Sequence, residues 1–234
     1  MTAEDRSDPL TVVAVSDLHG HLPDVPACDL LLIAGDLTPA TPPVASLHGP
    51  TDPDLPRRQR EWLKGPFADW LRSIPAKEIV GIAGNHDFAF QDDAIAADLT
   101  DLPWTYLQDT AAEVAGLKIH GTPWQPWFHD WAFNAPKDGG EAFLAERFAL
   151  IPADVDVLVV HGPPKGYGDL TSGGFEAGST ALLEAIDRTR PRLAVFGHIH
   201  EAPGRWARGA TELVNATHVD LEYQPVNPPI ELRL

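Results

Sequence analysis

The chain has 234 residues, 44% hydrophobic and 22% charged, a composition typical of a globular protein, and we expect a single domain over residues 1–234. Its 17 Lys and Arg residues face 34 Asp and Glu residues, so the formal net charge is −17, which argues against a surface that binds extended nucleic acid. The single cysteine, Cys28, excludes an internal disulfide and a zinc site built on two or four thiolates.

The first ten residues, MTAEDRSDPL, are polar and acidic. They lack the basic flank and the apolar run of a signal peptide, and the longest apolar stretches of the chain have the length of strands. We therefore expect a cytoplasmic protein that does not interact with membranes.

Five short apolar runs predict buried β-strands, because each is only strand-sized and stops at a glycine or a polar residue. Helical segments alternate with them, which predicts an α/β protein whose ligand site lies beyond the carboxyl ends of the strands. The runs cover residues 11–16, 30–35, 78–83, 155–160 and 193–197.

Apolar residues at spacings of three and four predict an amphipathic helix between the second and third runs. We expect it to be kinked near Gly65 and Pro66, since proline disrupts a helix interior. Two further helices are predicted over 142–150 and 179–188. The residues that define the first helix are Leu63, Phe67, Trp70, Leu71 and Ile74.

The segment 38–56 contains six prolines and no apolar period, so we expect a surface loop there. It carries His48 and could fold over the site as a lid, although we favour a solvent-facing histidine. Further on, EVAGLKIHGTP predicts a hairpin that turns at Ala115 and Gly116. The tail, residues 205–234, is typical of short strands separated by proline-rich turns.

Side chains that bind metals or transfer protons follow all five runs. If the runs were neighbouring strands of one sheet, these side chains would meet at one edge. Imidazole, carboxylate and one amide oxygen, without thiolate, suit manganese, iron, zinc or a similar ion. Seven donors are too many for one catalytic metal with an open position but fit two metals that share a carboxylate. The donors are Asp17, His19, Asp36, Asn85, His161, His198 and His200.

The charge of such a centre indicates its substrate. Two divalent ions, two aspartates and one hydroxide leave roughly +1, which attracts anions. Phosphate esters are the expected substrates.

The ordered motifs D-x-H, GD, GNHD, HGPP and GHIH between Asp17 and His200 resemble those of the calcineurin-like metallophosphoesterase superfamily. Longer segments are similar to the metallophosphoesterase-domain-containing proteins related to class III cyclic-nucleotide phosphodiesterases. These segments are GTPWQPWFHDWAFN at 121–134, HGPPKGYGDL at 161–170, FGHIHE at 196–201 and QPVNPPI at 224–230. The resemblance implies a four-layer α/β/β/α sandwich, in which helices flank two mixed sheets.

The resemblance also implies roles for the motif residues. It assigns His86 as the catalytic histidine that faces the substrate and Asp87 as the residue that orients its ring. Substrate would contact Asn85, His86 and His200. One metal ion would be held by Asp17, His19 and His200, the other by Asn85, His161 and His198, with Asp36 bridging the two.

The sequence thus predicts a dinuclear phosphoesterase in which a metal-bridging hydroxide attacks the phosphorus of a small phosphodiester. A cyclic nucleotide, 3′,5′ or 2′,3′, is the favoured substrate, and His86 would protonate or stabilise the leaving oxygen. Two alternatives stay open, a phosphomonoesterase acting on another phosphorylated substrate and a nucleotide-binding metalloprotein with low turnover. A homodimer also stays open.

One aromatic-rich stretch allows two interpretations. Its side chains could stack on a base or pack as a small core or dimer face, and we favour packing. Five histidines lack motif support, namely His21, His48, His120, His129 and His218. The aromatic residues are Trp124, Trp127, Phe128, Trp131 and Phe133.

Overall fold

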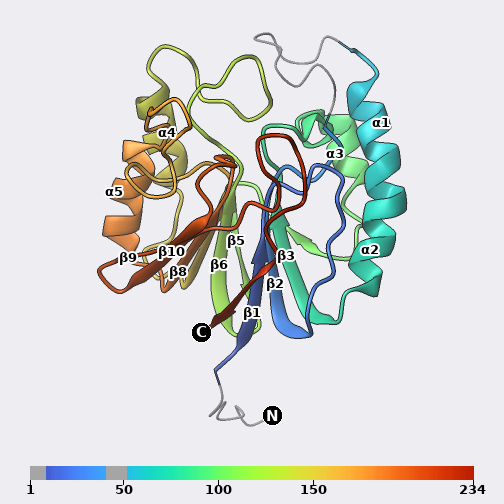
Figure 1. Cartoon of the computed structure of the whole chain (residues 1–234), viewed down its shortest axis with the longest axis horizontal. Coiled ribbons are helices and arrows are strands. Elements are labelled where there is room, and N and C mark those ends of the chain that lie inside the picture. Colours follow the sequence, from blue (N-terminus) through green and yellow to red (C-terminus); the bar gives the residue numbers. More distant parts are fainter. Residues whose placement is uncertain (1–8, 41–51) are drawn as a thin grey trace.

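Two β-sheets pack against each other in the computed structural model, which describes residues 9–40 and 52–234 (Figure 1). The first sheet has the strand order β11-β1-β2-β3-β4 and the second β5-β6-β7-β8-β10-β9. Both are mixed, since β11, β5 and β9 run antiparallel to their neighbours. The first sheet contains β1 (Thr11–Val15), β2 (Cys28–Ala34), β3 (Ala76–Ile82), β4 (Thr105–Tyr106) and β11 (Ile230–Arg233). The second contains β5 (Thr110–Val114), β6 (Leu117–Thr122), β7 (Val157–Val160), β8 (Leu193–Phe196), β9 (Gly204–Arg208) and β10 (Thr211–Asn215).

All five predicted strands form, but they are divided between the two sheets. β1, β2 and β3 are parallel neighbours in the first sheet, and β7 and β8 are parallel neighbours in the second. A single sheet carrying all five is therefore excluded. The four-layer sandwich that the resemblance implied is confirmed.

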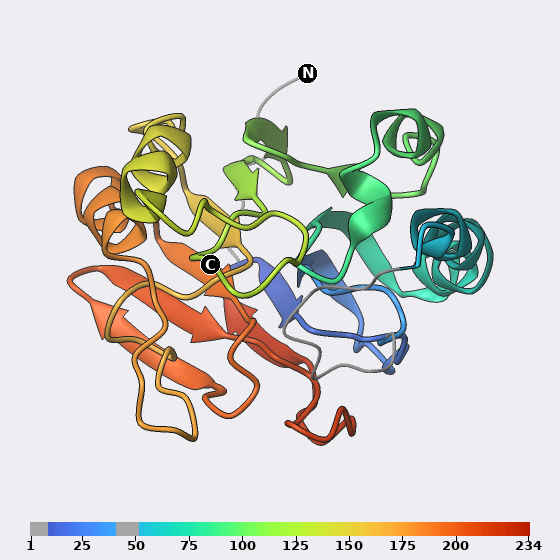
Figure 2. The ribbon, with the colours of Figure 1, turned by 90° about the horizontal axis from the view of Figure 1, so that it is seen from above.

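Alternating side chains along each strand build separate layers of the core, because successive residues point to opposite faces of a sheet. In β1, Val12 and Ala14 belong to the cluster between the sheets, whereas Val13 and Val15 belong to the cluster beneath the first helices. A third cluster lies between the second sheet and the helices α4 (Gly140–Phe148) and α5 (Thr180–Thr189). Seen from above, helices cover both outer sides (Figure 2).

The predicted kinked helix forms, but it begins earlier than its apolar pattern indicated. It consists of α1 (Leu55–Trp62), a π-helical turn (Leu63–Phe67) and α2 (Ala68–Ser73). Gly65 has the non-helical angles φ −102° and ψ −105°, directly before Pro66. Only Leu55 and Gln59 of α1 are buried, so this segment has no apolar stripe by which to recognise it.

The other helices and turns follow local signals to different degrees. Both predicted helices appear as α4 and α5 with ends shifted by one or two residues, and Ser179 caps α5 by accepting a hydrogen bond from the backbone N–H of Leu182. The hairpin turns at Ala115 and Gly116, as predicted. The short helix α3 (Asp93–Asp98) was not predicted, because none of its residues is buried.

The proline-rich segment is only partly described. Residues 41–51, which include His48, lie outside the described residues, so the lid and the solvent-facing histidine both stay predictions. Among the helices that are described, none combines the length and the apolar character needed to cross a bilayer.

Candidate active site

Loops after five parallel strands bring the predicted donors together at the carboxyl edge of both sheets, uppermost in Figure 1. The loops run alongside one another: the backbone N–H of Asp17 donates to Gly35 (3.0 Å), and that of His19 donates to Asp36 (2.9 Å). Ser16 joins the two sheets, since its N–H donates to Ala216 and its carbonyl accepts from His218, 2.8 Å in each case. The site is therefore built across the seam between the sheets.

Four of the donor residues have a left-handed backbone. Their φ angles are +54° for Asp17, +44° for His19, +53° for Asp36 and +69° for His198. Such angles cost a residue with a Cβ about 1–2 kcal/mol, and they cluster at functional sites. Their concentration here indicates that the placement of these side chains outweighs the conformational cost to the backbone.

One group of donors lies around the pair of aspartates. Donor atoms of Asp17, His19, Asp36 and His200 lie within 4.8 Å of one another. The Nε2 atom of His19 is 3.5 Å from Asp36 Oδ2 and 3.3 Å from His200 Nε2, which in turn is 3.2 Å from Asp17 Oδ1. Nitrogen and carboxylate lone pairs thus converge on one small volume, as a bound cation requires.

A second group converges on the other side of Asp36. The Nε2 atom of His161 is 3.5 Å from Asp36 Oδ2 and 2.8 Å from Asn85 Oδ1. Asn85 Oδ1 is also 2.7 Å from His198 Nδ1. Asp36 therefore lies between the two groups and reaches both, which makes it the geometric bridge.

Hydrogen bonds outside the site orient two of the histidines. His161 Nδ1 donates to the Ala34 carbonyl (2.8 Å) and His200 Nδ1 donates to the Asp220 carbonyl (3.1 Å), which leaves each Nε2 lone pair facing the site.

Backbone donors hold the two aspartates. The backbone N–H of His198 donates to the Asp17 carboxylate (3.0 Å), and that of His86 donates to Asp36 Oδ1 (2.7 Å).

Two glycines leave room for the carboxylates. A Cβ at Gly197 would lie 1.9 Å from Asp17 Oδ2, and one at Gly84 would lie 2.4 Å from Asp36 Oδ1. Both contacts are far below van der Waals separation, so no larger residue fits while the aspartates hold these positions.

The charges of the site support its use as a metal centre. Burial alone would raise the pKa of Asp36, but the charges of His161 and His86 hold that pKa well below its usual value. Burial and the charge of His161 lower the pKa of His198 to about 3. Burial opposes the charged form of His161, yet Asp36 raises its pKa to about 9. Metal ligands must be deprotonated, so binding here would release the His161 proton.

His86 and Asp87 lie beside this centre. His86 Nε2 is 4.0 Å from Asp36 Oδ2, and its ring packs on Trp131 with centroids 4.1 Å apart. Among the described residues, the Asp87 carboxylate bonds the backbone N–H groups of Leu37, Thr38 and Gly84 and the Thr38 hydroxyl, at 2.8–3.1 Å. Asp87 thus ties the loop after β2 to the loop after β3, and its bonds do not include the His86 ring.

Sequence reasoning missed two residues of the site. Tyr223 comes from the C-terminal tail, and its ring lies 4.6 Å from that of His19 and 5.4 Å from that of His200. Gln59 on α1 donates to the His86 carbonyl (2.6 Å) and to the Thr38 hydroxyl (2.9 Å). No motif spacing marks either residue, although Tyr223 directly precedes the segment QPVNPPI.

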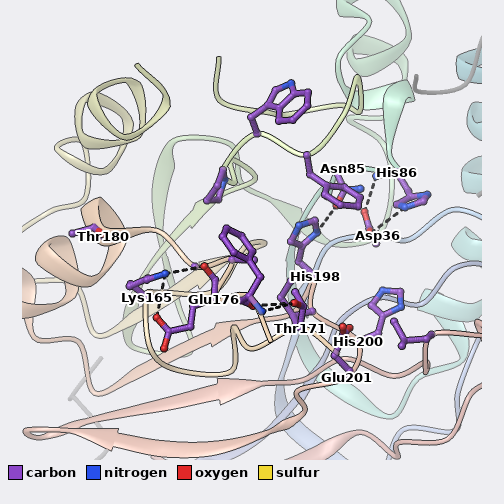
Figure 3. Close-up of a pocket in the computed structure, with 18 of the residues that line it drawn as sticks. Asp36, Asn85, His86, Lys165, Thr171, Glu176, Thr180, His198, His200 and Glu201 are labelled. Carbon is purple, nitrogen blue, oxygen red and sulfur yellow. Dashed lines mark hydrogen bonds and ion pairs between the residues drawn. The ribbon is translucent and has the colours of Figure 1, made fainter. Parts of the chain in front are cut away.

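A cavity of about 650 Å³ opens from this centre. Asp36, Asn85 and His86 lie at one end, and Lys165, Glu176 and Thr180 lie at the other (Figure 3). The aromatic stretch contributes to the wall and to the core. Trp131 and Phe133 are buried, as the packing interpretation predicted, whereas Trp127 and Phe128 line the cavity.

A family model described as calcineurin-like phosphoesterase matches residues 10–202. The chain belongs to the calcineurin-like phosphoesterase family. It is 37% identical to metallophosphoesterase domain-containing protein 1 of Homo sapiens, over 95% of this chain and 70% of that protein. It is 32% identical to a UPF0046 protein of Caenorhabditis elegans, over 94% of this chain and 60% of that protein.

A solved crystal structure with 16% sequence identity superposes on this phosphoesterase with a TM-score of 0.61, covering 96% of this chain and 99% of that one, and shares its fold. Membership of the family makes this protein a phosphoester hydrolase of a class that typically binds two metal ions. The donor set described above fits such ions, because oxygen and imidazole nitrogen atoms meet in two groups around a shared carboxylate.

Proposed function

We propose that this phosphoesterase hydrolyses a small phosphodiester at a two-metal centre, with a cyclic nucleotide as the first substrate to test. The observation that carries the proposal is the position of Asp36, 3.5 Å from His19 on one side and 3.5 Å from His161 on the other. The shared core between the sheets supports the further proposal that residues 1–234 form a single domain.

Each metal site would draw on both sheets. The first would use Asp17 and His19 after β1 with His200 after β8, and the second would use Asn85 after β3 with His161 and His198 after β7 and β8. Manganese, iron or zinc would suit these ligands. When bound, such a pair neutralises phosphoryl charge and lowers the pKa of water so that it can attack phosphorus.

The chain's own residues would handle the leaving group. His86 lines the cavity and lies next to the bridging carboxylate, so its Nε2 can donate a proton or a hydrogen bond to the leaving oxygen as the P–O bond breaks. Trp131 behind the ring limits its rotation. Asp87 would act as a positioning residue, since it fixes the loop that carries His86.

The cavity supports a small substrate. Its 650 Å³ lie in the range of small-molecule sites, and the formal charge of −17 disfavours long nucleic acid. Asn85, His86 and His200 all line the cavity, which supports the substrate contacts expected for them.

Two substitutions test the proposal. Asp36→Ala should remove both bound metal and activity, because it deletes the bridging ligand. His86→Ala should keep the metal content and lower kcat by roughly 10²- to 10⁴-fold, the usual contribution of a proton-transfer group. Elemental analysis measures the metal content of each variant. Activity is measured as turnover of cyclic nucleotides, linear diesters and monoesters with manganese, iron or zinc.

The exposed Asp154 offers a matched control, since Asp154→Ala removes a carboxylate whose side chain is 71% exposed. Circular dichroism establishes that each variant is folded. If His86→Ala hydrolysed phosphodiesters at the parent rate, the role of His86 would be wrong. Faster turnover of monoesters than of diesters would favour the phosphatase alternative. Metal binding without turnover would favour the alternative of a nucleotide-binding metalloprotein.

A further inference from the structure

Two exposed phenylalanines line the cavity that contains the metal ligands. Phe128 is 49% exposed and Phe175 is 69% exposed, although both border the same space as Asp36 and His86. They come from different loops, one between β6 and α4 and one between β7 and α5. Large apolar side chains exposed inside a cavity mark a ligand surface.

One side chain hydrogen-bonds both backbone polar groups of Phe128. The amide of Asn134 accepts from the Phe128 N–H (3.3 Å) and donates to the Phe128 carbonyl (3.1 Å). Asn134 is itself fixed by Gln125, whose Nε2 donates to Asn134 Oδ1 (2.9 Å). The ring of Phe128 then lies 5.8 Å from that of His198, edge to face, directly beside the metal ligands.

Phe175 is held in the same way by Thr171. The Thr171 hydroxyl accepts from the Phe175 N–H (3.1 Å) and donates to its carbonyl (2.9 Å), and the Thr171 N–H donates to the same carbonyl (2.8 Å). The next residue, Ser172, donates its N–H to Glu201 Oε1 (2.7 Å), which ties this loop to the segment that carries His200. Both rings are therefore exposed, and side-chain hydrogen bonds hold the backbone of each.

The lining of this cavity contains no unpaired lysine or arginine among the described residues. Lys165 lies 5.9 Å from the Phe175 ring centre, but its Nζ is 3.2 Å from Glu176 Oε2 and donates to the Glu176 carbonyl (2.8 Å). Trp127, Ile199 and Leu221 add apolar surface. The cavity beyond the metal ligands thus suits a flat, uncharged group better than a second phosphate.

We propose that Phe128 and Phe175 bind a flat aromatic substituent of the phosphoester, such as a nucleobase, and so select the substrate. The proposal rests on the proposed function only in placing the phosphate of the ligand at the metal ligands. Asn134 and Thr171 are positioning residues, which act by fixing the two phenylalanine backbones. Preorganisation of this kind lowers the entropy lost on binding.

Binding of two matched ligands tests the proposal on the metal-loaded protein. Adenosine 5′-monophosphate and ribose 5-phosphate share the phosphate and the sugar but differ in the base. The parent should bind the nucleotide more tightly by calorimetry. Phe128→Ala and Phe175→Ala should each lower the ratio of the two affinities by roughly 5- to 150-fold, the range measured for stacking on one base.

Further variants separate stacking from bulk. Phe175→Leu keeps an apolar side chain without a flat face and should not restore the ratio. Thr171→Val removes the hydroxyl that holds Phe175 and should lower the ratio by less than Phe175→Ala does. Leu150→Ala, at a residue that is 53% exposed and outside the lining of this cavity, is the matched control.

Three results would overturn the inference: equal affinities of the two ligands for the parent, equal weakening of both ligands in the Phe→Ala variants, or full rescue by leucine. These outcomes are independent of turnover. A parent that binds the nucleotide selectively but hydrolyses no phosphoester would instead contradict the proposed function while supporting the aromatic site.

Discussion

Burial affects histidines in this protein in different ways, according to the charges around them. His161 lies against Asp36, and that carboxylate outweighs burial and raises the pKa of the ring to about 9. His120 in β6 is 1% exposed, and neither of its ring nitrogens has a hydrogen-bond partner among the described residues. Burial lowers the pKa of His120 to about 4, with only weak opposition from Asp109. His120, one of the five histidines without motif support, is thus buried and uncharged at neutral pH.

This shift predicts a specific loss of stability in acid. The pKa of His120 falls from 6.5 to about 4 on folding, so between these values the unfolded chain binds more protons than the native protein. Above pH 6.5 the burial of His120 does not reduce the free energy of unfolding. As the pH falls below 6.5 it reduces the free energy of unfolding, by about 2 kcal/mol at pH 5. Denaturant unfolding of the parent and of His120→Leu at pH 7 and pH 5 measures it. Equal losses in the two proteins would show that the pKa of His120 does not change on folding.

At the scale of the element, backbone conformation decides where strands turn. The β5–β6 hairpin places Ala115 at φ +54° and Gly116 at φ +80°, with Val114 paired to Leu117. Two successive left-handed residues form the tight turn that matches strand twist, and Asn-Gly is the preferred pair there. Glycine adopts this conformation freely, whereas alanine does so at a cost.

Replacing Ala115 should therefore change stability in a predictable direction. Ala115→Asn should raise the free energy of unfolding by about 0.5–1 kcal/mol, because asparagine tolerates the left-handed region. Thermal unfolding should show an increase in Tm of roughly 1–4 °C. Ala115→Val is the opposing control, since a β-branched residue is strained there. A valine variant as stable as the asparagine variant would contradict this account.

At the scale of the whole molecule, the site joins the two sheets. Asp17, Asp36 and Asn85 follow strands of the first sheet, whereas His161 and His198 follow strands of the second. The backbone N–H of His198 reaches across to Asp17, and His161 Nδ1 reaches across to the Ala34 carbonyl. Metal ions bound at this seam would hold both sheets through their ligands.

Chelation should therefore destabilise the entire fold. A ligand that binds only the native state at a hundred times its Kd stabilises that state by about 2.7 kcal/mol. For a chain of this size, this corresponds to a loss of roughly 5–11 °C in Tm on metal removal. Thermal unfolding with a chelator, and after manganese is restored, measures the change. The Tm of Asp36→Ala should not depend on metal. If the chelator left the Tm of the parent unchanged, this would argue against metal binding at the seam.

Local chemistry by itself predicted the strands, the main helices and the candidate donor residues. Apolar runs of strand length, the kink at Gly65 and Pro66, and the motif residue after each strand are local signals. Each one involves only a few consecutive residues. Donor types are a property of the side chains, so the prediction of a metal centre did not need coordinates. The α/β class followed from the alternation of elements, and the four-layer arrangement followed from the resemblance.

Contacts between distant parts of the chain were decided only by tertiary structure. The division of the five strands between two sheets depends on which strands pair, and β10 enters beside β8 although it follows the last motif. Tyr223 reaches His19 because the tail folds back over the site, and no local spacing encodes that approach. Trp131 is buried while Phe128, three residues earlier, stays exposed, because burial depends on what packs against each face and not on hydrophobicity alone.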